Sequence, residues 1–314
     1  MNTPSTLDTP PRAAVPAHAG TPRRTLLAAC RHGARRALQW RLLLWWTVLL
    51  ALPTLAATLP VWRLLAENLD YSPLAARLAE RLDLLAIADL ATSAREYHAH
   101  ALEGGAIVAL LLTLLLSPLL AAMTAAAAAP TPPSRQPQGV GALLGAGAHG
   151  YLRMLRMLAW GSVPLGVAVA LGGLATHAAD RAAEAAVLQA DGERAELLAR
   201  LAVLLLVLLA HATLDTGRAL LAAEPHRQSA VLAWFGACRR LARRPLALFG
   251  AYAALTAPGL LLAGALLLAR LHVPALGGAG TAASWVLTLL PVIALGWMRG
   301  ARLLALTELV RSAR

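Results

Sequence analysis

The chain alternates between long apolar stretches and shorter polar segments. Each apolar stretch is rich in Leu, Ala and Val and runs without the every-second-residue alternation of a membrane β-strand. The six stretches cover residues 40–62, 105–129, 157–178, 199–220, 246–269 and 282–303. Each supplies the roughly 20 residues with which a helix crosses a hydrocarbon core about 30 Å thick, and helices satisfy their own backbone polar groups in lipid. The pattern predicts an all-α, polytopic membrane bundle of six transmembrane helices.

The composition agrees with a lipid environment. The mean hydropathy is +0.61, and only 14% of the residues are charged, whereas soluble domains carry about a quarter. All 28 basic residues are arginines, a bias typical of a GC-rich bacterial genome. Without lysine the chain can contain neither a Walker-type P-loop nor a Schiff-base enzyme site.

The distribution of charge between the loops predicts the orientation of the spans. The two ends of the chain and every second loop together hold 20 arginines and 4 carboxylates. The other three connections hold 8 arginines and 12 carboxylates. Those three are residues 63–104, 179–200 and 270–281. Because basic residues are retained on the cytoplasmic side, we expect both termini in the cytoplasm of a bacterial inner membrane and three hairpins that reach outward.

Proline, glycine and charge divide the chain into four parts. The first part is a disordered cytoplasmic tail at residues 1–22, and the second is a hairpin at 23–129 with an outward amphipathic segment at 63–104. A Pro/Gly linker follows at 130–142. The fourth part is a four-span region at 143–314, with hairpins at 143–222 and 229–310. The tail and the linker are too rich in proline to bury a core. In the outward segment, Ser72 and Pro73 favour a helix start, and leucines recur at helical spacing from Leu74 to Leu85.

Basic amphipathic segments precede the hairpins. Residues 29–38 and 237–246 are identical at seven of ten positions, and residues 149–159 form a related unit. Either a real duplication or chance similarity in a chain rich in Ala, Arg and Leu explains this weak repeat. Both explanations predict interfacial helices whose arginines meet lipid phosphates. The apolar side of the unit before the fifth span is expected to hold Leu232, Phe235 and Leu241.

A cluster of four arginines lies in the same unit. They are Arg239, Arg240, Arg243 and Arg244. At helical spacing these like charges repel one another, and lipid phosphates would remove that cost. The cluster is either a specific contact for anionic phospholipids of the lipid bilayer or the ordinary positive excess that sets topology. Because the basic residues are confined to membrane-proximal segments, we expect no nucleic-acid partner.

Three ionisable residues gather near the end of the fourth apolar stretch. His211 and Asp215 share a helix face, and Asp215 reaches Arg218 three residues on. Ionisable groups at membrane depth are candidate functional groups, so this polar site could serve a small permease, whereas a structural salt bridge near the membrane surface is the alternative. Prolines inside spans can mark the broken helices of transporters, and here they are Pro53, Pro118, Pro164, Pro258 and Pro291.

The sequence carries no motif for catalysis, cofactor binding or metal binding. Glu96, His100 and Glu103 share a helix face, but we interpret them as part of a solvated outer segment. Cys30 and Cys238 both fall on the expected cytoplasmic side, so no disulfide is predicted. We therefore expect no enzyme activity, no cofactor and no metal.

Part of the chain resembles a known family. The residues that carry the resemblance are Asp215-Thr-Gly-Arg218, Glu224 to Ser229, Leu241-Ala-Arg-Arg-Pro245 and Phe249-Gly-Ala-Tyr252, with Gly147 to Arg156 as an aromatic and basic approach to the third span. Over residues 145–260 they resemble an uncharacterised family of bacterial six-span inner-membrane proteins, distantly similar to the membrane domain of glycerophosphodiester phosphodiesterases. The resemblance implies a six-span fold and no established activity.

Together these patterns predict a non-enzymatic, multi-pass inner-membrane protein with basic interfacial helices, which contacts anionic lipid or partner membrane proteins. The alternative is a small permease that uses His211, Asp215 and Arg218.

Overall fold

The computed structural model of the chain describes residues 22–70, 72, 75, 84–129, 139–186, 188–273 and 277–312, and over these residues its regular elements are all helices. They are α1 (Pro22–Ala37), α2 (Trp40–Leu69), α4 (Leu84–Tyr97), α5 (Ala99–Ala127), α6 (Val140–Glu184), α7 (Gln189–Ala223), α8 (Ala230–Arg243), α9 (Pro245–Leu271) and α10 (Gly277–Ser312). Six of the described helices, α2, α5, α6, α7, α9 and α10, are long and apolar enough to cross a membrane. The predicted all-α fold with six helices that could span a membrane is confirmed.

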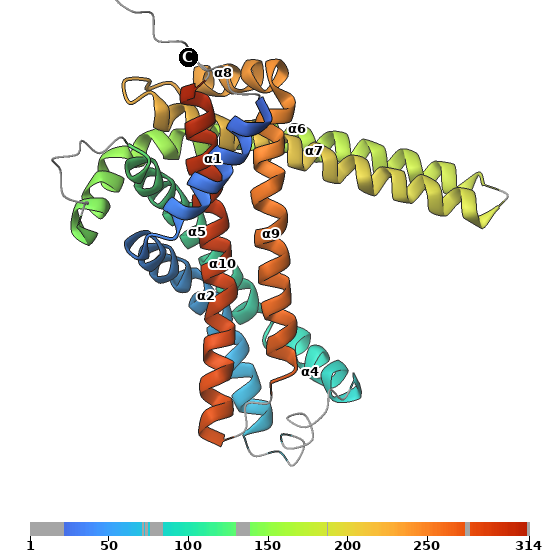
Figure 1. Ribbon diagram of the computed structural model, residues 1–314. Helices are drawn as coiled ribbons and strands as arrows, with labels where there is room; N and C mark the ends of the chain where they lie inside the picture. The colour runs from blue at the N-terminus through green and yellow to red at the C-terminus, as the bar shows by residue number, and fades with distance from the viewer. Residues whose placement is uncertain are drawn as a thin grey trace, which may run out of the picture.

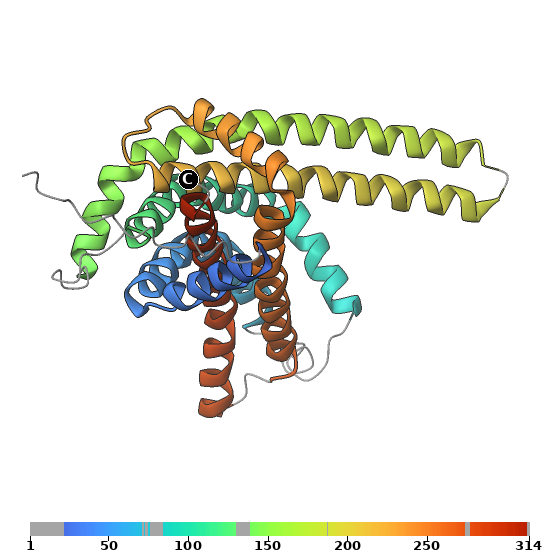
Figure 2. The same ribbon diagram turned by 45° about the horizontal axis from the view of Figure 1, so that its top comes forward.

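The long helices pair into three antiparallel hairpins, α2 with α5, α6 with α7, and α9 with α10 (Figure 1). The α6–α7 hairpin projects crosswise to α9 and α10, and its tip lies far from the tips of the other two hairpins. Figure 2 shows the same crosswise arrangement from a second direction. The hairpins therefore do not form one parallel bundle but share contacts mainly near one end.

Small residues let α6 and α7 approach each other closely. A Cβ added to Gly172 would lie 3.1 Å from the Val203 Cγ2 atom, and one added to Gly161 would lie 3.3 Å from the Leu214 Cδ1 atom. The outer faces of this hairpin carry leucines such as Leu174, which is 66% exposed. Lipid tails are as apolar as leucine, so paired helices in a membrane can leave such faces without protein contact.

The largest buried core lies where helices from all three hairpins meet. Its most deeply buried side chains include Met157 of α6, Leu220 of α7 and Leu306 of α10. At this end α1 packs across α9 and α10, and α8 packs on α7 (Figures 1 and 2). We call this region the hub and define it as α1, α8 and residues 120–128, 153–161, 210–224 and 297–311.

Two of the three predicted basic segments form helices of their own, α1 and α8. The break after α8 has a local cause, since a proline disfavours helical conformation in the residue before it. Arg244, which precedes Pro245, has φ −138° and ψ 58°, and the chain turns there from α8 into α9. The third unit, residues 149–159, contains no proline and forms no separate helix; it is part of α6, which begins at Val140.

Several predicted segments fall partly or wholly outside the described residues. Of the predicted tail only Pro22 is described, and it begins α1; of the linker, residues 130–138 are outside, and the residues from Val140 onward belong to α6. The predicted amphipathic helix is also mostly outside, and α4, which packs on α5, begins only at Leu84.

The prolines within the spans do not end helices. Each lies inside a helix that continues past it, with Pro53 in α2, Pro118 in α5, Pro164 in α6, Pro258 in α9 and Pro291 in α10. The interrupted helices typical of transporter sites are therefore not found at these five positions.

Candidate functional site

A buried ion pair joins α7 to α10 in the hub. The side chain of Asp215 in α7 is 7% exposed, and its Oδ1 accepts a hydrogen bond of 2.7 Å from Nη1 of Arg218. Its second oxygen, Oδ2, lies 2.6 Å from Nη2 of Arg302 in α10. One carboxylate thus holds two guanidinium groups, one from its own helix and one from another hairpin.

The Arg302 guanidinium is fixed on its other sides by α9. Its Nη1 donates a hydrogen bond of 3.1 Å to Oγ1 of Thr256, and its Cζ atom lies 4.5 Å from the centroid of the Tyr252 ring. Such a position over an aromatic face is a favourable cation–π contact. We call Asp215, Arg218, Arg302, Tyr252 and Thr256 the Asp215 cluster, and it ties α7, α9 and α10 together.

Of the three residues predicted for a polar site, Asp215 and Arg218 form an ion pair. The Nδ1 atom of His211 lies 3.0 Å from the Val207 carbonyl oxygen of its own helix. Sequence reasoning missed Arg302, Tyr252 and Thr256. In the sequence, Arg302 counted only toward the positive charge that predicts orientation. Residue spacing within one helix does not show that α10 packs on α7.

A second buried carboxylate anchors α8. Glu224 follows α7 directly and is 6% exposed. Its Oε2 accepts a hydrogen bond of 2.5 Å from Nε of Arg227, and its Oε1 lies 3.6 Å from Nη2 of Arg240 in α8. At the other end of this turn, the Ser229 hydroxyl caps α8 by accepting a 3.3 Å hydrogen bond from the Leu232 amide.

The predicted cluster of four arginines is therefore not uniform. Arg240 is half-buried against Glu224, while Arg239, Arg243 and Arg244 are exposed. The predicted apolar side of the helix also needs a correction, because Leu241 is 7% exposed and belongs to the hub core. Hydropathy alone cannot distinguish an apolar residue that faces protein from one that faces lipid.

Three further arginines cap the ends of helices. At the end of α5, Arg36 of α1 donates a hydrogen bond of 2.9 Å to the Ala127 carbonyl oxygen, and Arg311 of α10 donates one of 2.6 Å to that of Ala128. Arg153 of α6 donates to the carbonyl oxygens of Leu221 and Pro225 at the end of α7. Carbonyls of a last helical turn lack partners within the helix and carry partial negative charge, so a guanidinium there is favourable.

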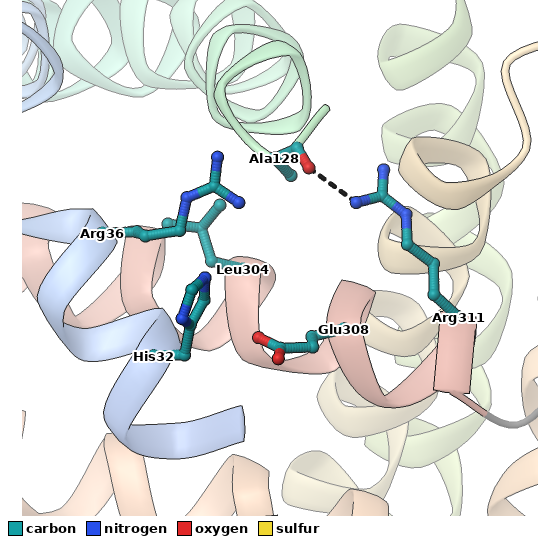
Figure 3. A pocket seen from close by; sticks show the side chains of 6 residues that line it. All are labelled: His32, Arg36, Ala128, Leu304, Glu308 and Arg311. Atoms are coloured by element: carbon teal, nitrogen blue, oxygen red, sulfur yellow. Dashed lines mark hydrogen bonds between the residues drawn. The ribbon is translucent and has the colours of Figure 1, made fainter. Parts of the chain in front are cut away.

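The two caps on α5 border a small polar cavity of about 200 Å³ (Figure 3). Its walls carry His32 and Arg36 from α1, and Glu308 and Arg311 from α10. Both arginines are already bonded to carbonyl oxygens, and Glu308 adds a negative charge. This mixture does not select an anion or a cation.

The residues considered for metal binding do not assemble into a site. Among the described residues, no group of three or more His, Cys, Asp or Glu side chains could hold a metal ion. His98, which lies between Glu96 and His100 in the sequence, is beside α2, with its Nε2 atom 3.5 Å from the Glu67 carboxylate. Cys30 and Cys238 are free thiols, and burial raises the pKa of each. Raised pKa values favour the unreactive protonated thiol at neutral pH.

The described hub thus contains two buried carboxylates clamped by arginines, two helix ends capped by three arginines, and one amphipathic helix with exposed arginines. These contacts can hold helices together and present positive charge to a neighbouring surface. The comparisons with known proteins add no relative, since no protein-family model, curated protein or solved structure matches the chain.

Proposed function

We propose that the chain is a non-enzymatic multi-pass protein of the bacterial inner membrane, with both termini in the cytoplasm and the hub at the cytoplasmic face. There α8 contacts the anionic phospholipids of the inner leaflet. The observation that carries the proposal is a division among the hub arginines. One set is bonded to carbonyl or carboxylate oxygens of the protein, whereas Arg239, Arg243 and Arg244 are exposed on or beside α8.

The outer face of α8 supports a lipid as the neighbour of these arginines. At about 100° per residue, Leu232, Phe235, Arg239 and Arg243 fall within about 80° of one another around the helix. Leu232 is 62% exposed and Phe235 is 57% exposed. A face with large apolar side chains and arginines together is typical of a helix that lies in the headgroup layer, where the apolar groups enter the acyl boundary and the arginines meet phosphates.

The Asp215 cluster supports a structural role rather than transport. Both oxygens of Asp215 are held by guanidinium groups, and its side chain is 7% exposed. A carboxylate that binds and releases a proton or substrate needs access to it, which this arrangement does not offer. We therefore interpret Asp215, Arg218 and Arg302 as a clamp between helices and do not propose a permease.

Lipid binding to α8 can be measured by native mass spectrometry of the full chain in detergent. The protein is incubated with equal amounts of phosphatidylglycerol and phosphatidylcholine, and the retained lipids are counted. The wild type should retain phosphatidylglycerol preferentially. The triple variant R239A/R243A/R244A should lose at least about tenfold of that preference, since each arginine near an anionic surface contributes about 1 kcal/mol.

The triple variant leaves Arg240 in place, so the pair with Glu224 and the anchoring of α8 are retained. A matched control, R181A/R194A/R200A, removes the same charge from exposed positions near the tip of the α6–α7 hairpin. It should bind phosphatidylglycerol as the wild type does. Equal retention by the wild type and the α8 variant would refute the proposed lipid contact and leave a partner protein as the candidate occupant of α8.

A further inference from the structure

A cleft of about 600 Å³ lies between α6 and the start of α8. From α6 it is lined by Arg156, Ala159, Trp160 and Val163, whose spacing of three, four and seven residues places them on one helix face. The turn into α8 contributes residues 228–231. The volume falls within the range of about 300–1,000 Å³ that is usual for sites that hold one small ligand.

The polar part of the cleft favours a negative charge. Arg156 is exposed, and Ala230 and Val231 begin α8 directly after its capping residue Ser229. The first amides of a helix have no partner within the helix and carry partial positive charge. The Ser229 hydroxyl accepts from the Leu232 amide, which leaves the amides of Ala230 and Val231 as donors at this helix end. An arginine next to a helix N-terminus is a suitable site for a phosphate group.

The remaining walls of the cleft are apolar. Ala159, Val163 and Val231 line the cleft together with the ring of Trp160, which packs edge to face on Trp234 at 5.9 Å between ring centroids. The indole Nε1 of Trp160 is buried and does not reach the surface, so the ring adds only apolar area to the cleft.

The surface of α6 beyond the cleft can hold an acyl chain. Val163 is 47% exposed, and Val167, one turn further into the apolar span, is 54% exposed. A ligand with a phosphate at Arg156 and a hydrocarbon tail would therefore find apolar surface along the same helix face. A free phosphate ion would leave those apolar walls uncovered.

We propose that this cleft binds one anionic phospholipid. The phosphate contacts Arg156 and the start of α8, and an acyl chain follows Ala159 and Val163. The inference deepens the proposed function, because it rests on the hub lying in the headgroup layer. It names a separate site, since Arg239 lies about 12 Å along α8 from Val231 at 1.5 Å per residue.

The test is a native mass spectrometry titration of the full chain in detergent with phosphatidylglycerol, in which the dissociation constant of the tightest bound lipid is measured. R156A should weaken this binding at least about tenfold, as expected for loss of a charged hydrogen-bond partner. A159W should weaken it comparably by filling the cleft while leaving every charge in place. R181A removes an exposed arginine at the far end of α6 and should bind as the wild type does.

The outcomes separate the alternatives. If R156A and A159W both titrate like the wild type, the cleft is not the lipid site and the inference is wrong. If millimolar glycerol 3-phosphate displaces the lipid and A159W binds like the wild type, the site recognises a free phosphate compound instead, which also overturns it. Loss of binding in R156A but not in R239A/R243A/R244A would support the cleft and refute the α8 contact. Loss of binding in R239A/R243A/R244A but not in R156A would support the α8 contact and refute the cleft. A thermal melt of each variant confirms that it is folded.

Discussion

Removal of the negative charge of Asp215 should destabilise the hub far more than removal of an exposed carboxylate. In D215N the guanidinium groups of Arg218 and Arg302 keep their charges, and their side chains are only 25% and 11% exposed. They would then repel each other across the α7–α10 contact without a carboxylate between them. Loss of one partner of a buried ion pair costs about 3–5 kcal/mol. Solvent screens part of the Arg218 contribution, so we expect about 3 kcal/mol.

The assay is unfolding of the full-length protein in mixed micelles, with SDS as the denaturant and far-UV circular dichroism as the signal. The control is D180N, which neutralises an exposed carboxylate near the end of α6 and should change the free energy of unfolding by no more than about 0.5 kcal/mol. The double variant D215N/R302M removes the uncompensated cation as well. Its loss should be smaller than the sum of the two single losses by about 0.5–3 kcal/mol, the usual coupling between residues in contact.

Two results would refute the clamp. A loss below about 1 kcal/mol in D215N would mean that the carboxylate does not hold the helices together, since breaking a buried pair costs several times more. Strict additivity in the double variant would mean that Asp215 and Arg302 do not interact in solution. Loss of a transport activity with stability unchanged would favour the permease hypothesis instead.

Two further predictions address orientation and packing. An alkaline phosphatase fused at Glu184 should be active and one fused at Arg135 silent, because the enzyme is active only outside the cytoplasm; the reverse pattern would invert the proposed topology. G33A should lower the free energy of unfolding by about 1–3 kcal/mol, since a Cβ at Gly33 would lie 2.7 Å from the Ala301 carbonyl oxygen, a backbone atom of α10. G264A is its control, because a Cβ there meets no atom within 4 Å, and alanine in a helix interior should add about 0.5–1 kcal/mol of stability. A neutral G33A would mean that α1 does not pack on α10 at this distance.

The sequence was sufficient for the number and type of the spans, because the length and continuity of an apolar run are local properties. It also indicated the basic helix α8, although the predicted unit 237–246 runs past the end of α8 at Arg243 into α9. Its two errors have different causes. Leu241 was expected in the lipid interface but faces protein, and residues 149–159 were expected as a separate helix but continue into α6. The hydropathy of Leu241 is the same whether it faces protein or lipid, so the sequence could not distinguish the two environments. Residues 149–159 contain no proline that would end a helix before the third span.

The hub could be predicted only in part. The i,i+3 spacing of Asp215 and Arg218 was enough to pair them, because both lie on one helix. The pairing of Asp215 with Arg302 depends on how two hairpins pack, which local spacing does not report. The caps made by Arg36, Arg153 and Arg311 were missed for another reason. Their acceptors are backbone carbonyls, which every residue possesses, so the acceptor side of such a contact leaves no trace in the sequence.

The arginine caps couple two properties of a membrane protein that are usually treated separately. Arg36, Arg153 and Arg311 belong to the charge excess from which the insertion direction was predicted, and the same guanidinium groups complete the last turns of α5 and α7. An engineer who moved these charges to the opposite loops in order to invert the protein would therefore also strip two helix ends of their caps. In the proposed orientation, the direction of insertion and the tertiary fold depend on the same few side chains, so they cannot be redesigned independently.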